Sequence, residues 1–250
     1  MTDYRRIFPL NKQLHGPGPV VYWMSREQRV SDNWGLYHAQ QLALERKVPL
    51  LVVFTLADGF MGATQRHYGF MLRGLELVAQ RLSGLAIPFL VMRGEPAITM
   101  LRFINQEQAG CLVCDFDPLR IKRLWFDRVA AKAQIPVVEV DGHNIVPCRI
   151  ASPKQEYGAY TLRPKVKRLL PEFLTAIPQV IRHPFPWQRT VDRFDAEQLL
   201  SQLQPDTGVG EVPGFLPGEA AAADALVDCI DARLPGYAVR RNDPLAEGQS

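Results

Sequence analysis

Long apolar runs and dense cysteines are both missing from this chain. No stretch of about 18 uninterrupted apolar residues occurs, and no apolar segment follows the basic pair Arg5 and Arg6, so we expect neither a membrane span nor a secretory signal. Four cysteines in 250 residues do not resemble the disulfide framework of a small secreted domain and are typical of a reducing compartment. The sequence therefore predicts a cytoplasmic protein with no membrane partner.

The chain also lacks a large excess of positive or negative charge. The chain has 29 Lys and Arg against 26 Asp and Glu, a net charge of +3, which does not by itself indicate a nucleic-acid partner. Any basic surface must be local. Hydrophobic residues make up 47% of the sequence, which is ordinary for a globular protein with a sizeable core.

Motifs for phosphate binding, metal binding and nucleophilic catalysis are missing as well. Gly16-Pro-Gly18 precedes the first expected strand, whereas a dinucleotide-binding loop follows it, and no GxxxxGK[ST], Ser/His/Asp elbow or HExxH helix occurs. Asp141-Gly-His-Asn144 is explained by a turn. Cys111 and Cys114 form a CxxC in an expected strand, where side chains three residues apart point to opposite faces, so we interpret them as core residues.

Short apolar runs alternate with helical patterns along the first 150 residues. Each run is apolar at consecutive positions, as in strands that are covered on both faces. The runs are residues 20–23, 50–56, 89–92, 111–114 and 137–140. The alternation predicts an α/β fold, a doubly wound five-stranded parallel sheet of Rossmann-like type with helices on both faces.

Helix signals lie between these strands. We expect helices over residues 34–46 with Asp32 as the N-cap, over residues 67–81, from Pro96, and after Pro118 with Asp117 as a plausible N-cap.

The pattern changes after Val146. A basic helix is expected over residues 160–170, with Pro164 in its first turn. Its cations could contact phosphates, although interleaved apolar residues are also typical of an ordinary amphipathic helix with a solvated face. A Pro-rich connector follows, and then a helix over residues 218–233 that Pro235 and Gly236 terminate.

Ligands of doubly wound sheets bind at the carboxyl ends of the strands. Tyr22-Trp-Met-Ser-Arg26 ends the first strand and could hold a planar anionic molecule, while core packing and a turn explain the same residues equally well. Asp115-Phe-Asp-Pro-Leu-Arg120 ends the fourth strand, where Asp115 could accept a hydrogen bond from a ligand.

Several of these segments, in this order, resemble class II cyclobutane-pyrimidine-dimer photolyases of the photolyase/cryptochrome family. The resemblance extends from about Val20 to Pro244, and its first motif is long and specific. The matching segments are residues 20–34, Arg93-Gly-Glu-Pro96, Asp115-Phe-Asp-Pro-Leu-Arg120, residues 140–147, Lys154-Gln-Glu-Tyr157, Arg163-Pro-Lys165, Leu234-Pro-Gly-Tyr237 and Arg241-Asn-Asp-Pro244.

The resemblance implies a DNA-repair lyase, a two-domain flavoprotein that uses light to split pyrimidine dimers in damaged DNA. An N-terminal α/β domain holds an antenna chromophore in some members, a deazaflavin or a folate, and a larger helical domain binds FAD and the dimer. We expect residues 1–150 to be the antenna domain, 151–217 the basic helix and Pro-rich connector, and 218–250 the first helix and linker leading to the FAD domain. The FAD site and the catalytic residues are expected beyond Ser250, so the chain should be inactive by itself.

Strand-end position and resemblance together select the antenna-site residues. One wall is expected from Trp23, Met24, Ser25 and Arg26, and the other from Asp115, Phe116, Arg120 and Arg123, with Arg93 and Glu95 as second choices. The chain departs from the family pattern at Gly142, where Ala is expected, and at Asp117, where Ser is expected.

Two other interpretations stay open. One is a freestanding nucleotide-binding α/β module of the stress-protein or electron-transfer-flavoprotein type. The other is a structural interaction domain whose Pro-rich connector and terminal helix bury an apolar face against a partner, although self-association through Leu226, Val227 and Ile230 would give the same observation.

Overall fold

The structure is a computed structural model that describes residues 1–191 and 194–245. The chain divides into two compact units. Residues 1–62 and 78–195 form the first, and residues 63–77 together with those from 196 onward form the second. In the described ranges, no helix is long and apolar enough to cross a membrane.

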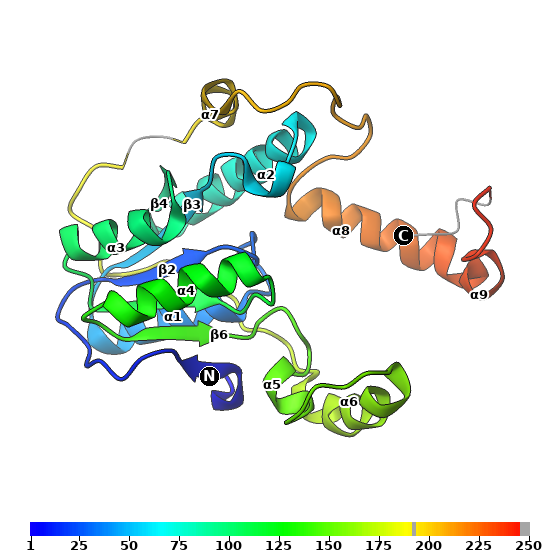
Figure 1. The fold of residues 1–250 in the computed structure, drawn as a ribbon, viewed down its shortest axis with the longest axis horizontal. Coiled ribbons are helices and arrows are strands. Elements are labelled where there is room, and N and C mark those ends of the chain that lie inside the picture. Colours follow the sequence, from blue (N-terminus) through cyan, green and yellow to red (C-terminus); the bar gives the residue numbers. More distant parts are fainter. Residues whose placement is uncertain (192–193, 246–250) are drawn as a thin grey trace. The chain divides into compact units, whose positions relative to one another are not determined.

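A mostly parallel six-stranded sheet forms the centre of the first unit (Figure 1). Its spatial order is β1-β6-β5-β2-β3-β4. The strands are β1 (Ile7–Pro9), β2 (Val20–Met24), β3 (Leu50–Leu56), β4 (Phe89–Arg93), β5 (Cys111–Asp115) and β6 (Val137–Val140). Every residue of β2, β3 and β5 is buried, as expected of central strands covered on both faces.

The five parallel strands expected from the sequence are confirmed, but the prediction of a five-stranded sheet is wrong by one strand. The sixth strand, β1, runs antiparallel along the edge of β6, with Ile7 opposite Val140. It has only three residues, one of them proline, and none of the three is fully buried. A short edge strand of this kind has no run of apolar residues by which the sequence would reveal it.

Helices cover both faces of the sheet, as predicted. Helix α1 (Trp34–Arg46) packs on the face that carries Tyr22, while α3 (Pro96–Gln106) and α4 (Arg120–Lys132) pack with Trp23 on the other. The remaining elements are η1 (Tyr4–Arg6), η2 (Phe60–Gly62), α2 (Gln65–Gly84), α5 (Cys148–Ala151), α6 (Ala159–Phe173), α7 (Ala196–Leu203), α8 (Glu219–Asp228), η3 (Cys229–Arg233), η4 (Leu234–Gly236) and α9 (Tyr237–Arg240).

Two predicted helix caps differ from the structure. Asp32 has a left-handed backbone, and the N-cap of α1 is instead Asn33, whose Oδ1 accepts from the backbone N–H of Leu36 at 2.8 Å. Asp117 lies two residues ahead of the N-cap of α4, Leu119, and accepts from the Leu119 N–H at 2.9 Å. Asp and Asn form such turns just as readily as caps, so neighbouring positions are hard to distinguish in a sequence.

Two predicted helix boundaries also differ. Pro164 is not in the first turn of α6 but in its interior, together with Pro171. Both prolines are on the exposed side of the helix, where the carbonyl groups that they leave unbonded can face water. Pro235 and Gly236 do not end the last helical stretch, because η3, η4 and α9 continue it to Arg240.

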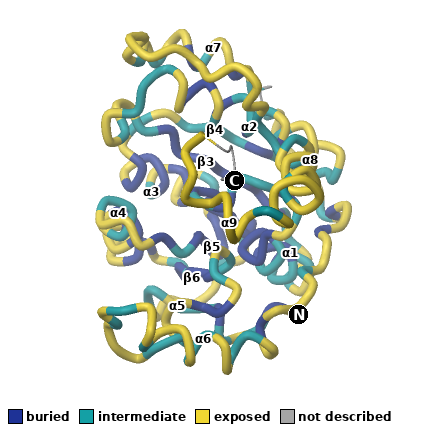
Figure 2. The backbone as a smooth tube through the Cα atoms, turned by 90° about the vertical axis from the view of Figure 1, so that its right-hand side faces the viewer, coloured by how far each residue is buried: buried dark blue, intermediate teal, exposed yellow. Residues whose placement is uncertain are grey.

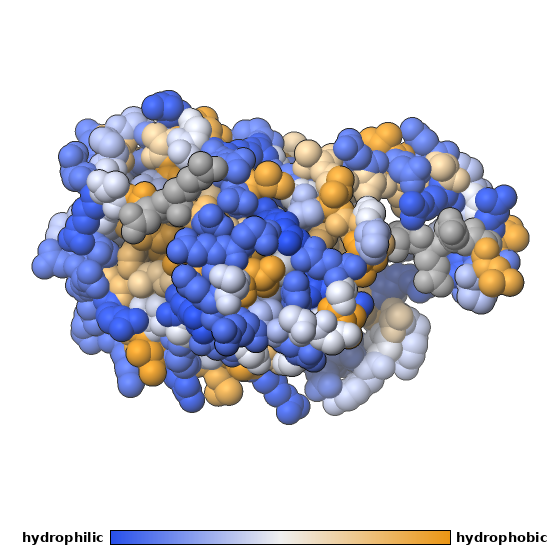
Figure 3. All heavy atoms as spheres, turned by 90° about the horizontal axis from the view of Figure 1, so that it is seen from above, coloured by the Kyte–Doolittle hydropathy of each residue, from blue (hydrophilic) through white to orange (hydrophobic). Residues whose placement is uncertain are grey.

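Burial follows this architecture. The central strands β2, β3 and β5 and the inner sides of α1, α3 and α4 are buried, whereas α9 is exposed along its length and α8 is exposed except at the half-buried Glu219 and Ala221 (Figure 2). Leu226, Val227 and Ile230, singled out in the sequence, are exposed residues. On the face seen in Figure 3, hydrophobic and hydrophilic side chains both reach the surface.

Candidate active-site edge of the sheet

The carboxylate of Asp115 is the centre of the strand-end region in the first unit. Asp115 is the last residue of β5 and is 1% exposed. Its Oδ2 accepts from the backbone N–H groups of Ser25, Arg26 and Glu27 at 2.9, 2.8 and 3.0 Å. Its Oδ1 accepts from the Tyr22 hydroxyl at 2.5 Å. The loop after β2 is therefore folded around this carboxylate.

Tyr22 and Asn33 complete this hydrogen-bonded network. Asn33 Nδ2 donates to the Tyr22 hydroxyl at 3.1 Å and to the carbonyl oxygens of Glu27 and Arg29 at 3.0 and 2.9 Å. Burial, followed by the neighbouring Asp115 charge, raises the pKa of Tyr22 well above its usual value. Tyr22 is therefore a fixed donor to Asp115 rather than a group that ionises.

Lys122 on α4 approaches the same loop. Its Nζ donates to Ser25 Oγ at 2.7 Å and lies 5.1 and 5.0 Å from the ring centroids of Phe60 and Trp125. Burial lowers the pKa of Lys122, while the charges of Asp117 and Asp115 oppose this effect. The sequence interpretation did not select Lys122, although its spacing of three residues from Trp125 on a helix would have placed the two side by side.

Glu27 is a buried acid at the edge of this region. It is 1% exposed, pairs with Arg29, and its Oε1 lies 3.2 Å from His143 Nδ1. Burial, assisted by the negative charge of Asp115, raises the pKa of Glu27 to about 7. Neither Glu27 nor His143 was selected from the sequence, because only the fold brings residues so far apart in the chain together.

On the first predicted wall of the antenna site, most side chains are buried or already paired with other residues of the chain. Trp23 and Met24 are fully buried, and Trp23 Nε1 donates to Thr55 Oγ1 at 2.9 Å while its ring stands edge-on to Phe126. Ser25 is also buried. Arg26 is half-buried, and its Nη1 lies 3.9 Å from Asp117 Oδ1.

On the second predicted wall, Phe116 is half-buried and Arg120 is exposed. Arg123 is instead paired with the buried carboxylate of Glu139, which also binds Arg149 at 2.6 Å.

Arg93 and Glu95, the second choices for the antenna site, are exposed at the rim of this region. Arg93 Nε donates to Asp58 Oδ1 at 2.7 Å, and Glu95 caps α3 by accepting from the Ile98 N–H at 2.7 Å. Among the ten predicted residues, Arg26, Phe116 and Arg120 combine accessibility with a position at the strand ends, as does Arg93 at the end of β4, although Arg93 is paired with Asp58.

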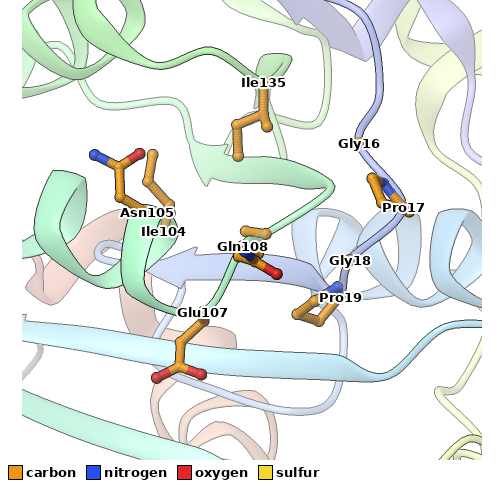
Figure 4. Close-up of a pocket in the computed structure, with 10 residues that line it drawn as sticks. Gly16, Pro17, Gly18, Pro19, Ile104, Asn105, Glu107, Gln108 and Ile135 are labelled. Atoms are coloured by element: carbon orange, nitrogen blue, oxygen red, sulfur yellow. The ribbon is translucent and has the colours of Figure 1, made fainter.

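A separate cavity lies at the opposite, amino-terminal edge of the sheet (Figure 4). It measures about 650 Å³ and is formed by the segment before β2 and the turn between α3 and β5. Its lining includes Gly16, Gly18 and Gln108, and a Cβ on Gly18 would meet the Gln108 carbonyl oxygen at 1.8 Å. This close backbone packing gives the Gly16-Pro-Gly18 motif a structural reason that requires no phosphate.

Comparisons with known proteins agree with this doubly wound architecture, which is that of a photolyase N-terminal α/β domain. The family model described as DNA photolyase matches residues 20–184. The chain therefore belongs to the DNA photolyase family.

Curated relatives carry the name deoxyribodipyrimidine photo-lyase. The protein from Potorous tridactylus is 47% identical over 226 residues, which cover 90% of this chain and 42% of that protein. The protein from Arabidopsis thaliana is 38% identical over 237 residues, covering 91% of this chain and 48% of that protein. The chain thus spans about half the length of the curated relatives it matches.

A solved structure supports the fold. The bacterial class III photolyase from Agrobacterium tumefaciens is similar to this chain with a TM-score of 0.64 and 19% sequence identity. The similarity covers 88% of this chain and 46% of that one. At this identity the comparison supports the architecture alone.

Replacing Asp115 by alanine should destabilise the first unit strongly. The change leaves three backbone N–H groups and one hydroxyl without their buried acceptor, so we expect the free energy of unfolding to fall by at least about 3 kcal/mol in urea titrations. Asp117→Ala in the same loop removes an acceptor for one backbone N–H and should cost only about 1 kcal/mol. Equal losses in the two variants would contradict the central role of Asp115.

Glu27 should make stability depend on pH. Its pKa in the folded chain, about 7, lies above its usual value of 4.5, so its contribution is fully present below pH 4.5 and is lost as pH rises through 7. A pKa shift of this size changes the free energy of unfolding by on the order of 3 kcal/mol. Relative to Glu27→Gln, the wild type should lose stability between pH 4.5 and 8 in urea titrations. Glu45→Gln, which removes an exposed carboxylate on α1, is the matched control. If the stability of Glu27→Gln changed with pH in parallel with that of the wild type, the raised pKa of Glu27 would be contradicted.

Proposed function

We propose that this chain is the antenna-chromophore half of a class II photolyase, which uses light to split cyclobutane pyrimidine dimers in DNA. The observation that carries the proposal is the match to the DNA photolyase family over residues 20–184. The names of the curated relatives and the order of the motifs from Val20 to Pro244 support it.

The proposal divides the activity between two halves. FAD binding, dimer binding and electron transfer to the dimer belong to a helical half that corresponds to the part of the relatives this chain does not span. The same proposal includes the division of the chain into an antenna domain over residues 1–150, a basic helix and connector over residues 151–217, and a first helix and linker over residues 218–250. The chain is then a cytoplasmic component of a flavoprotein but does not itself hold the flavin.

The rim of the strand-end region suits a planar anionic chromophore. Arg26 and Arg120 supply cations, and Phe116 supplies a ring for stacking. Asp115 does not fit the role of ligand acceptor, because it already accepts four hydrogen bonds. When bound, a deazaflavin or folate would absorb light and pass the excitation energy to the flavin. Trp23, Met24 and Asp115 would then position the loop that carries Arg26 rather than contact the chromophore.

Chromophore binding tests the site. A 5-deazaflavin titrated into the chain should bind, and Arg26→Ala should weaken binding about tenfold, since it removes a charge-assisted contact. The change in deazaflavin fluorescence measures binding. Arg102→Ala, an exposed arginine on α3, is the control and should bind as wild type does. Equal affinity of wild type and Arg26→Ala would overturn the site, and binding of adenine nucleotides in place of the deazaflavin would favour a freestanding nucleotide-binding module.

Repair activity tests the division between halves. Under near-UV or blue light, these 250 residues, purified and with added FAD, should repair no dimers in an oligonucleotide that contains one, because the proposal assigns the flavin to the part of the relatives that they do not span. The full-length Potorous tridactylus enzyme serves as the positive control. Light-dependent repair by the chain alone, measured by restored restriction cleavage at the dimer site, is the result that would refute the proposal.

A further inference from the structure

Positive charge is concentrated in one segment of the first unit, residues 148–173, which contains α5 and α6. It holds six Lys and Arg against two Glu, a net charge of +4. The other 224 residues hold 23 Lys and Arg against 24 Asp and Glu. The positive balance of the whole chain therefore resides in this segment, which lies beyond the β6 side of the sheet (Figures 1 and 2).

Both acids of the segment are already paired. Glu156 binds Lys165 and accepts from Ser152 Oγ, and Glu172 binds Arg5 at 2.7 Å. Arg149 is occupied as well, by Glu139. Four cations remain that have no acidic partner within residues 1–191 and 194–245, namely Lys154, Arg163, Lys167 and Arg168.

Three of these cations form an exposed row on α6. Arg163 and Lys167 are four residues apart and therefore follow each other along one side of the helix, with Arg168 next to them. All three are exposed, whereas Phe173 is buried and Val166, Leu169 and Leu170 are half-buried. The cations of α6 therefore project into solvent, while its large aliphatic side chains other than Leu162 are at least partly covered.

Two exposed tyrosines adjoin this row. Tyr157 is 91% exposed and Tyr160 is 82% exposed. Tyr160 precedes Arg163 by three residues and so shares its side of the helix. A Cβ on Gly158 would meet the Tyr160 ring at 2.6 Å, so the ring lies against the Gly158 backbone at the start of the helix. Cations interleaved with exposed aromatic rings are the pattern of nucleic-acid-binding surfaces.

We propose that this side of α6, formed by Tyr160, Arg163, Lys167 and Arg168, binds the phosphate backbone of DNA independently of base sequence. The inference rests on the proposed function, in which damaged DNA is the substrate. It adds a DNA contact on the α/β half itself. A membrane surface is the less suitable polyanion, because a helix that binds lipid inserts large apolar side chains, and the large aliphatic ones of α6 other than Leu162 are at least partly covered by the chain itself.

The experiment compares two triple variants of equal charge. In Arg163→Gln/Lys167→Gln/Arg168→Gln the row is removed, and in Lys12→Gln/Arg102→Gln/Lys132→Gln three exposed cations elsewhere in the first unit are removed. Binding of the full chain to an undamaged fluorescein-labelled DNA duplex is measured by anisotropy from about 25 to 200 mM salt. Circular dichroism establishes that each variant is folded.

The wild type should bind with a dissociation constant on the order of 10⁻⁴ to 10⁻⁶ M. The α6 variant should bind at least about tenfold more weakly, and the slope of log K against log salt should fall by about 2 to 3. The control variant should retain most of the wild-type affinity and slope. Equal losses in both variants, no loss in the α6 variant, or binding to anionic vesicles without binding to DNA would each overturn the proposal. Deazaflavin binding by the same α6 variant should be unchanged, so a failure of DNA binding is distinguishable from a failure of the antenna assignment.

Discussion

The burial of the Asp115 carboxylate is the constraint on which the strand-end region depends. A charge at 1% exposure is tolerated only when its lone pairs are filled, and here three successive backbone N–H groups and one hydroxyl fill them. The same contacts decide how close α1 can approach. A Cβ on Gly35 would meet the Tyr22 ring at 2.9 Å and Asp115 Oδ1 at 3.1 Å, so a glycine is needed where the helix crosses this network.

Arg6 fixes the loop after β6 by the same principle. Its guanidinium is 2% exposed and donates to the carbonyl oxygens of Asp141, Asn144 and Ile145 at 2.9, 2.9 and 2.6 Å. It also reaches the carbonyl of Phe173 at 3.3 Å, which ties the end of α6 to the loop after β6. Both loops are therefore held by internal charges of the chain itself. A ligand would bind to a preformed rim and would not have to order these loops.

The sequence was sufficient for the parts of the fold that depend on local pattern. Consecutive apolar residues located all five parallel strands, because a strand covered on both faces needs no polar side. It was insufficient where an outcome depends on register or on partners distant in the chain. Asp115 was taken for a ligand acceptor because its pairing with Tyr22 and the 25–27 loop follows from β2 and β5 lying side by side, with Tyr22 opposite Val113. The residues selected for the antenna site lie at the carboxyl ends of the strands, but the hydrogen bonds and ion pairs that several of them make within the chain are visible only in three dimensions.

The two proposed binding surfaces are chemically distinct although they belong to one unit. The rim at the strand ends combines a few cations with buried acids, since Glu27 and Asp115 lie directly behind Arg26, and such a mixed site suits a small ligand with one anionic group. The row on α6 has no acid of its own left unpaired, which suits a polyanion whose charges repeat along its length. Because salt screens exposed charges more than buried ones, ionic strength should weaken the α6 surface first, and the two kinds of binding can be separated in one protein.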